Sequence, residues 1–138
     1  MKGKENMQAN GLHPVKVKIT KRKGGVGALT IVDSSINTNS YRAMIASEVI
    51  DRLGNPNTVQ VGFGNQAIAI GSYIGEGFTT FELSDSGSKK VIYNKALVRQ
   101  LIEFYRLDFK DRTSMTFYEV KYGEEDGNCI ALITINND

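Results

Sequence analysis

The first clear pattern in the chain is a strict alternation of apolar and polar residues. Val15, Val17 and Ile19 alternate with two lysines and a threonine over residues 15–20, which is the period of a half-buried β-strand. The glycine-rich segment "KRKGGVG" follows, and then the short apolar run "ALTIV" at residues 28–32. Two strand-like runs around a glycine-rich connection predict a β-hairpin with a long loop.

A second pattern predicts a strand, a short helix and a hairpin within residues 41–70. "YRAMIA" can be extended, Ser47 is a good helix cap, and "EVIDRL" supplies a short amphipathic helix. Gly54 suits the left-handed residue that follows a helix end. The alternating runs "TVQVGF" and "QAIAI" then predict two strands around a turn at Gly64 and Asn65.

The same order returns after residues 71–88, a segment rich in glycine and serine that we interpret as a connector. "FTTFEL" within this connector is compatible with a strand. "KKVIY" is strand-like, Asn94 is a helix cap, and residues 95–107 carry apolar side chains at helical spacing. "SMTFYEVKY" and "CIALITI", on either side of "GEEDGN", predict a second hairpin.

The repeated order predicts an internal duplication. A shift of 54 residues places "RLGNPNTVQVGF" (52–63) over "RLDFKDRTSMTF" (106–117), with the arginine, the leucine and the last phenylalanine in common. We therefore predict an α+β, β-rich fold in which two β-α-β-β units share one core and follow an N-terminal hairpin. The residues expected in that core are Val49, Ile50, Leu53, Val61, Phe63, Leu97, Leu101, Leu107, Met115 and Phe117.

Length and composition place both units in one compact domain. The chain has 138 residues, of which 41% are hydrophobic and 23% charged, as in folded globular domains. We expect a flexible leader (1–14), the N-terminal hairpin and first unit (15–70), the connector (71–88) and the second unit (89–138). The leader is polar and no apolar run is as long as a membrane span, so we expect a cytoplasmic protein without a membrane partner. Cys129 lies in an apolar run, which favours a buried thiol.

Positive charge is concentrated near the N-terminus. Residues 1–27 hold seven cations and one acidic residue, whereas residues 28–138 hold ten cations and fourteen acidic residues. Such an asymmetry indicates a polyanionic partner such as DNA. The predicted nucleic-acid-binding cations of this segment are Lys16, Lys18, Lys21, Arg22 and Lys23. In the alternative interpretation, lysines on an edge strand prevent aggregation between sheets.

Motifs for small-molecule chemistry do not occur in the sequence. A phosphate-binding P-loop ends in Gly-Lys-Ser/Thr, whereas here the lysine precedes the glycines and Ala28 and Leu29 follow them. His13 is the only histidine and lies in the predicted leader, and no cysteine or histidine cluster has metal-ligand spacing. The acidic "EEDGN" at residues 124–128 lacks the spacing of a calcium loop. We therefore predict no nucleotide, cofactor or metal, and no enzymatic activity.

Two stretches, "ASEVIDRLGNPNTVQVGFGNQAIAI" (46–70) and "NKALVRQLIEFYRLDFKDRTSMTF" (94–117), resemble the swapped-hairpin AbrB family of small bacterial DNA-binding domains. Lys110 stands where that family has a turn glycine. The resemblance implies a pseudo-dimer of two units in one chain, with double-stranded DNA or a partner toxin as ligand. Because the family presents basic residues on the strand before the helix, the resemblance also implies a DNA-binding role for Arg42.

The sequence thus favours a small DNA-binding or regulatory protein that is not catalytic. The alternative is a protein–protein interaction module from a phage or mobile element, which binds a protein partner or a second copy of itself through its hairpin edges. A small-ligand sensor is a third class, and it requires a pocket.

Overall fold

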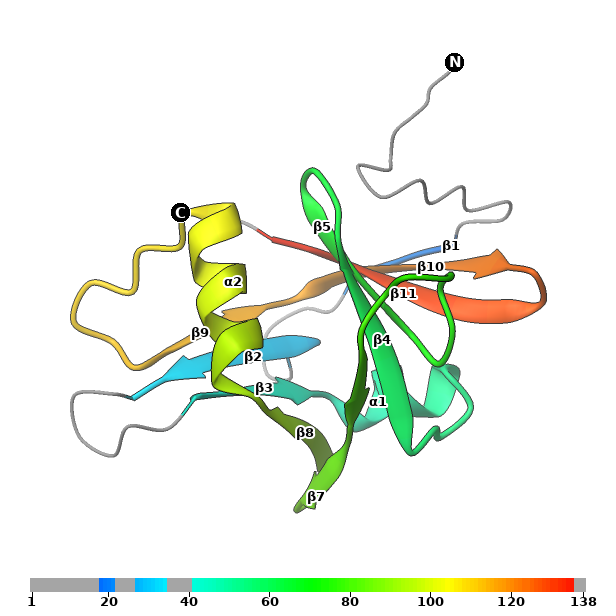
Figure 1. Ribbon diagram of the computed structural model, residues 1–138, viewed down its shortest axis with the longest axis horizontal. Coiled ribbons are helices and arrows are strands. Elements are labelled where there is room, and N and C mark those ends of the chain that lie inside the picture. The colour runs from blue at the N-terminus through cyan, green and yellow to red at the C-terminus, as the bar shows by residue number, and fades with distance from the viewer. Residues whose placement is uncertain (1–17, 22–26, 35–40, 136–138) are drawn as a thin grey trace.

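A computed structural model describes residues 18–21, 27–34 and 41–135 of the chain (Figure 1). These residues form two antiparallel sheets and two helices, which confirms the coarse prediction of an α+β, mostly β fold. Neither of the described helices is long and apolar enough to cross a membrane.

One sheet has six strands in the order β1-β10-β11-β5-β4-β6. Its strands are β1 (Lys18–Lys21), β4 (Thr58–Phe63), β5 (Ala67–Gly71), β6 (Thr80–Glu82), β10 (Glu119–Glu125) and β11 (Asn128–Thr134). The other sheet has five strands in the order β7-β8-β3-β2-β9. Its strands are β2 (Leu29–Asp33), β3 (Tyr41–Ile45), β7 (Ser84–Ser86), β8 (Lys89–Tyr93) and β9 (Ser114–Phe117).

The chain passes directly from one sheet into the other at two places. Only Leu83 separates β6 from β7, and only Tyr118 separates β9 from β10. Each pair is therefore one long strand that changes sheets at a single residue, and the two sheets are joined at both places.

The predicted N-terminal hairpin is wrong, because β1 and β2 lie in different sheets. β1 pairs with β10, whereas β2 pairs with β3 and β9. Lys21 lies opposite Glu119, and Leu29 lies opposite Phe117, so β1 and β2 meet the long β9–β10 strand on either side of Tyr118. That strand offers each N-terminal strand a ready partner, and the alternation of apolar residues does not reveal which partner is chosen.

Helix α1 (Ser47–Arg52) starts after Ala46 and not after Ser47. The amide N–H of Ala46 donates to the carbonyl of Ala28 at 3.0 Å, which holds residue 46 in extended conformation and makes Ser47 the first helical residue. The predicted end of the helix is confirmed. Gly54 has a positive φ of 89°, and the N–H groups of Gly54 and Asn55 donate to the carbonyls of Asp51 and Ile50.

Helix α2 (Lys95–Tyr105) has the predicted cap at Asn94, whose Oδ1 accepts a 2.8 Å hydrogen bond from the N–H of Leu97. It ends two residues before the predicted position. Arg106 adopts the left-handed conformation, and the N–H groups of Arg106 and Leu107 donate to the carbonyls of Glu103 and Ile102. α2 lies over β2 and β3 (Figure 1).

A single 54-residue offset does not relate the two halves of the chain. The helix caps Ala46 and Asn94 are 48 residues apart, and the left-handed residues Gly54 and Arg106 are 52 apart. The two offsets differ because the left-handed residue lies 8 positions after the cap of α1 and 12 positions after the cap of the longer α2.

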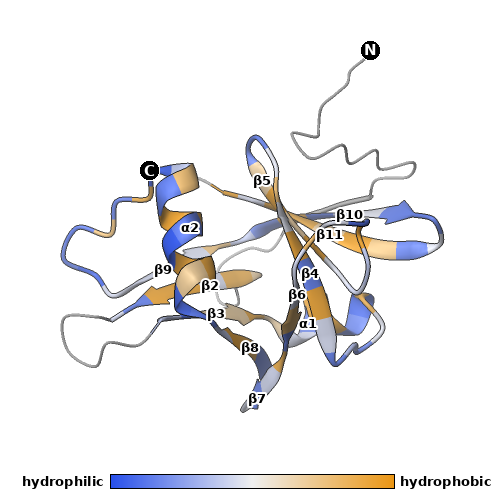
Figure 2. Cartoon of the chain, viewed as in Figure 1, coloured by the Kyte–Doolittle hydropathy of each residue, from blue (hydrophilic) through white to orange (hydrophobic). Residues whose placement is uncertain are grey.

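The main hydrophobic core lies between the sheets and the two helices. Hydrophobic residues concentrate in the strands, whereas the tip of the β10–β11 hairpin and one side of α2 are hydrophilic (Figure 2). All predicted core residues belong to this cluster, and only Phe63 is partly exposed. The predicted turn after β4 is shifted by one residue: the N–H of Gly64 donates to the carbonyl of Ala67, so Asn65 and Gln66 form the turn.

The predicted connector has a structural role of its own. Besides contributing β6 and β7, it covers the side of the six-stranded sheet that faces away from the main core, where Ile74 and Phe78 pack on Ala69 and Ile130. Gln60, on β4, holds this segment in place: its buried Oε1 accepts hydrogen bonds from the N–H groups of residues 74 and 75, at 2.6 and 3.1 Å.

Candidate nucleic-acid interface

The structure does not bring the predicted DNA-binding cations together in one sheet. Lys18 and Lys21 lie in β1, at one edge of the six-stranded sheet, whereas Arg42 lies in β3, the middle strand of the other sheet. The remaining predicted cations, Lys16, Arg22 and Lys23, lie outside the described residues. In the alternative interpretation of these lysines, they protect the edge of a sheet from aggregation, and β1 lies at such an edge.

Arg42 belongs to a second surface, the side of the five-stranded sheet that faces away from the main core. We call this side the outer face. Residues directly opposite each other on antiparallel strands share a face, so the pairing of the strands defines its members. They are Thr30, Val32, Arg42, Met44, Ser84, Ser86, Lys89, Val91, Tyr93, Ser114 and Thr116.

One row of the outer face combines a cation with an exposed aromatic ring. Across β9, β2, β3 and β8, the row reads Ser114, Val32, Arg42 and Tyr93. Arg42 is half-buried, whereas Tyr93 is 60% exposed, the largest exposure among the large hydrophobic side chains of the described residues. The guanidinium and the phenol ring are thus direct cross-strand neighbours.

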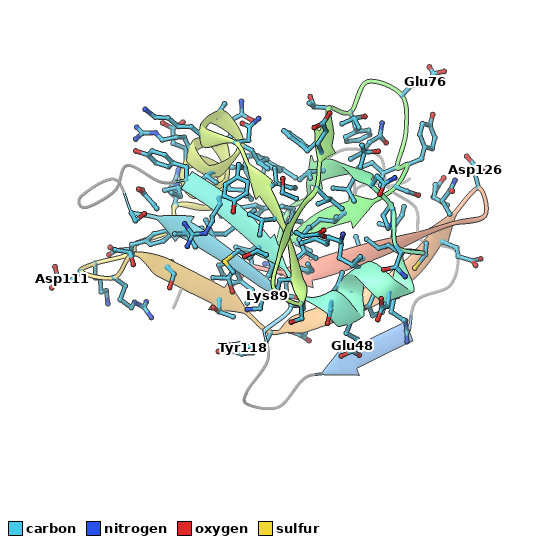
Figure 3. All side chains as sticks on the ribbon, turned by 90° about the horizontal axis from the view of Figure 1, so that it is seen from below. Glu48, Glu76, Lys89, Asp111, Tyr118 and Asp126 are labelled. Carbon is cyan, nitrogen blue, oxygen red and sulfur yellow. The ribbon has the colours of Figure 1, made fainter. Side chains whose placement is uncertain are left out.

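The rest of the outer face is rich in hydroxyl groups. Thr30 and Thr116 share a 3.0 Å hydrogen bond between their Oγ1 atoms, and Lys89, labelled in Figure 3, lies opposite Ser86. No aspartate or glutamate occupies an outward position of the five strands as described. Asp33 and Asp85 occupy positions of the opposite side of the sheet, where Asp85 forms an ion pair with Lys90. The outward positions of these described strands therefore hold two cations, Arg42 and Lys89, and no carboxylate.

Gly27, the described end of the glycine-rich segment, lies against this same face. A Cβ atom added to Gly27 would lie 2.0 Å from Cγ2 of Thr116, so the backbone at residue 27 rests directly on the outer face. Only glycine permits so close an approach. The described end of "KRKGGVG" thus lies against the methyl group of Thr116, the residue whose hydroxyl bonds to that of Thr30.

No protein-family model matches the chain, and no curated protein or solved structure is significantly similar to it.

A groove of about 380 Å³ lies elsewhere on the surface, between α2 and the β4–β5 hairpin. It is lined by Phe63, Gln100, Glu103 and Phe104, of which Phe104 is 51% exposed. Among the described residues that line the groove, Glu103 is the only one with an ionisable side chain, so these residues do not supply the pair of titratable groups that acid–base catalysis uses.

Tyr105 anchors the base of this aromatic cluster. Its ring centroid lies 4.9 Å from that of Phe104 and 5.9 Å from that of Phe63. Its hydroxyl donates toward the carbonyls of Gly64 and Ala67, at 2.9 and 3.1 Å. Burial raises the pKa of Tyr105 well above its ordinary value of 10.0. The hydroxyl is therefore a neutral structural group that ties α2 to the hairpin turn.

Cys129 is partly exposed, not fully buried as its apolar surroundings in the sequence suggested. Burial nevertheless raises the pKa of its thiol, although the positive charge of Arg52 acts in the opposite direction. The neutral thiol is a weak nucleophile. In the described ranges, no three histidine, cysteine, aspartate or glutamate side chains gather as a metal site would require.

Sequence reasoning missed Tyr93 as a candidate binding residue. Period-two alternation in "KKVIY" already places Lys89, Val91 and Tyr93 on one side of a strand. The alternation does not say that β3 is the neighbouring strand, and only this pairing puts Tyr93 beside Arg42.

Proposed function

We propose that this chain is a small, non-catalytic DNA-binding or regulatory protein built from two related units of AbrB-like form. The order of elements supports the duplication: β3-α1-β4-β5 is followed by β8-α2-β9-β10-β11, in which β9 and β10 are one long strand. Both helices end in the same pair of backbone hydrogen bonds. The matching strands β3 and β8 are neighbours in one sheet, and β5 and β11 are neighbours in the other, as a pseudo-two-fold axis would require.

The observation that carries the DNA-binding proposal is the composition of the outer face. Arg42 and Lys89 supply positive charge, and Ser114, Thr30 and Thr116 supply hydroxyl groups, without a carboxylate at an outward position of the same strands. Arginine, lysine, serine and threonine side chains are the usual donors to phosphate oxygens. A phosphate backbone lying across this face would therefore meet suitable donors and no acidic residue of these strands.

The basic segment adds to this surface in the proposal. Lys21 and Gly27, the described residues that flank it, both lie beside the long β9–β10 strand, and Gly27 touches the outer face. Replacing Lys21, Arg22 and Lys23 by alanine should then flatten the plot of log affinity against log salt by up to about 2–3 units, because each phosphate contact contributes about 0.9.

The direct test measures DNA affinity over a range of salt concentrations for wild type and for Arg42→Met. Methionine keeps an apolar stem over Val32 but removes the charge. We expect the variant to bind more weakly and to lose about 0.7–0.9 of the salt slope.

The matched control is Arg99→Met. Arg99 is exposed on α2, which packs on the opposite side of the five-stranded sheet, so its replacement should leave the slope unchanged. Equal slopes for wild type and Arg42→Met, or no DNA binding at low salt, would contradict the proposal.

A further inference from the structure

We infer that the outer face binds a single strand of nucleic acid in preference to a duplex, with Tyr93 as the residue on which a base stacks. This inference rests on the proposed function, because it specifies which form of DNA the same surface takes.

The width of the sheet argues against binding in a DNA groove. Five strands spaced about 4.8 Å apart span roughly 19 Å from β7 to β9. The major groove of B-form DNA is about 12 Å wide and admits a helix or a two-stranded ribbon. The outer face is too broad to enter that groove, so it can touch a duplex only along its phosphates. A single strand can lie on the face and present its bases to the side chains.

Tyr93 has the position and exposure that base stacking requires. It is the last residue of β8, it is 60% exposed, and its ring belongs to a face that is otherwise made of short side chains, aliphatic residues and two cations. Val91 and Val32 of this face are buried, whereas the ring of Tyr93 is exposed. Every base has an aromatic face, so an exposed tyrosine ring binds unpaired bases with little regard to sequence. In a duplex, the same bases are stacked on their neighbours and do not offer their faces.

The two cations of the outer face flank the ring in a way that suits one strand. Arg42 lies directly opposite Tyr93 on β3, where its guanidinium can contact the phosphate next to a stacked base. Lys89 lies on β8 itself, four residues before Tyr93 and roughly 13 Å away along the strand. A single strand that follows β8 would therefore pass Lys89 and then reach the ring of Tyr93, with Arg42 beside that ring on β3.

The experiment compares two labelled oligonucleotides by fluorescence anisotropy at several salt concentrations. One is a single strand of thymidines of about 20 nucleotides, longer than the roughly 4–16 that one single-strand-binding fold covers. The other is a duplex of the same length. We expect wild type to bind the single strand at least about tenfold more tightly.

Variants then separate stacking from simple charge. Tyr93→Ala should weaken single-strand binding by roughly five- to a hundredfold and change duplex binding little, whereas Tyr93→Phe should retain most of the affinity. The matched control is Tyr73→Ala, which removes another exposed tyrosine, one that follows β5 in the segment covering the other sheet; it should have no effect.

The outcomes distinguish this inference from the proposed function. Equal or tighter binding of the duplex, or unchanged single-strand affinity in Tyr93→Ala, would overturn the inference and leave a DNA-binding protein. If neither oligonucleotide is bound at low salt, the proposed function fails and the inference fails with it.

Discussion

Gly27 and Thr116 approach so closely that the side chain of any other residue at position 27 would overlap the threonine methyl group. A Cβ atom on residue 27 would lie 2.0 Å from Cγ2 of Thr116. The next residue, Ala28, is held in place as well: its N–H donates to the carbonyl of Phe117 in β9, and its carbonyl accepts from the N–H of Ala46, the residue before α1. The point at which the glycine-rich segment joins β2 is therefore fixed.

Gly27→Ala should therefore destabilise the fold. The added methyl group has to displace β9 or the backbone of residue 27, and overpacking of this kind costs about 1–3 kcal/mol in the free energy of unfolding. Urea denaturation followed by circular dichroism measures the loss. In a Thr116→Ser background, which removes Cγ2 but keeps the hydroxyl that contacts Thr30, the same substitution should cost less. An equal cost in the two backgrounds would contradict the packing argument.

Gln60→Leu should loosen the segment that covers the outer side of the six-stranded sheet. The substitution keeps the approximate volume but removes the acceptor of the N–H groups of Ile74 and Gly75 and the donor to the carbonyl of Phe78. Leaving such groups buried and unpaired costs about 1–3 kcal/mol each. Hydrogen exchange should accelerate at residues 74 and 75, and Gln100→Leu on the exposed side of α2 should leave both amides protected. Protection that persists in Gln60→Leu would show that the segment is held by its apolar contacts alone.

Asn94→Ala and Ser47→Ala form a matched pair of helix-start variants. Asn94 caps α2 with its side chain, whereas Ser47 is already inside α1 and Ala46 holds the cap position without a side-chain bond. We expect Asn94→Ala to lower the free energy of unfolding by about 1 kcal/mol and Ser47→Ala to change it by less than about half of that. Similar losses in thermal unfolding would mean that Ser47 acts as a cap after all.

Tyr105→Phe should lower stability by about 1–2 kcal/mol at neutral pH, because it removes the hydroxyl bonded to the Gly64 and Ala67 carbonyls. The pKa of Tyr105 is raised in the folded state above the value of 10.0 that the side chain has in the unfolded chain. The contribution of its hydroxyl to the free energy of unfolding is therefore complete below pH 10.0 and is lost as pH rises above that value. The stability difference between wild type and Tyr105→Phe should therefore narrow above pH 10.0. A difference that stays constant through that range would contradict the burial of the hydroxyl.

Local chemistry made much of this fold predictable. Asn94 and Gly54 mark the start of α2 and the end of α1 because capping needs only a short polar side chain or a residue without a Cβ at a defined place. The strands were readable because apolar residues alternate along them. Helical spacing in residues 95–107 predicted the burial of Leu101, and strand alternation predicted that of Phe117, both in one core.

Partner choice between strands was not predictable in this way. β1 and β2 carry the alternation of a hairpin, yet each pairs with the long β9–β10 strand, because pairing depends on which edges the folded chain makes available. Ala46, and not Ser47, is the N-cap of α1, because the N–H of Ala46 bonds to the carbonyl of Ala28, a residue far away in the sequence. The candidate site was hidden for the same reason: Tyr93 and Arg42 become neighbours only through the pairing of β8 with β3.

The pairing of β1 with β10 and of β2 with β9 also limits when the two sheets can form during synthesis of the chain. β1 and β2 are synthesised well before the strands with which they pair, since Lys18 pairs with Tyr122 and Leu29 with Phe117. Contacts so distant along the chain are slow to form. Before residue 114 is made, β2 has only β3 beside it and β1 has no strand beside it. The nascent chain therefore cannot complete either sheet until β9, β10 and β11 have been synthesised.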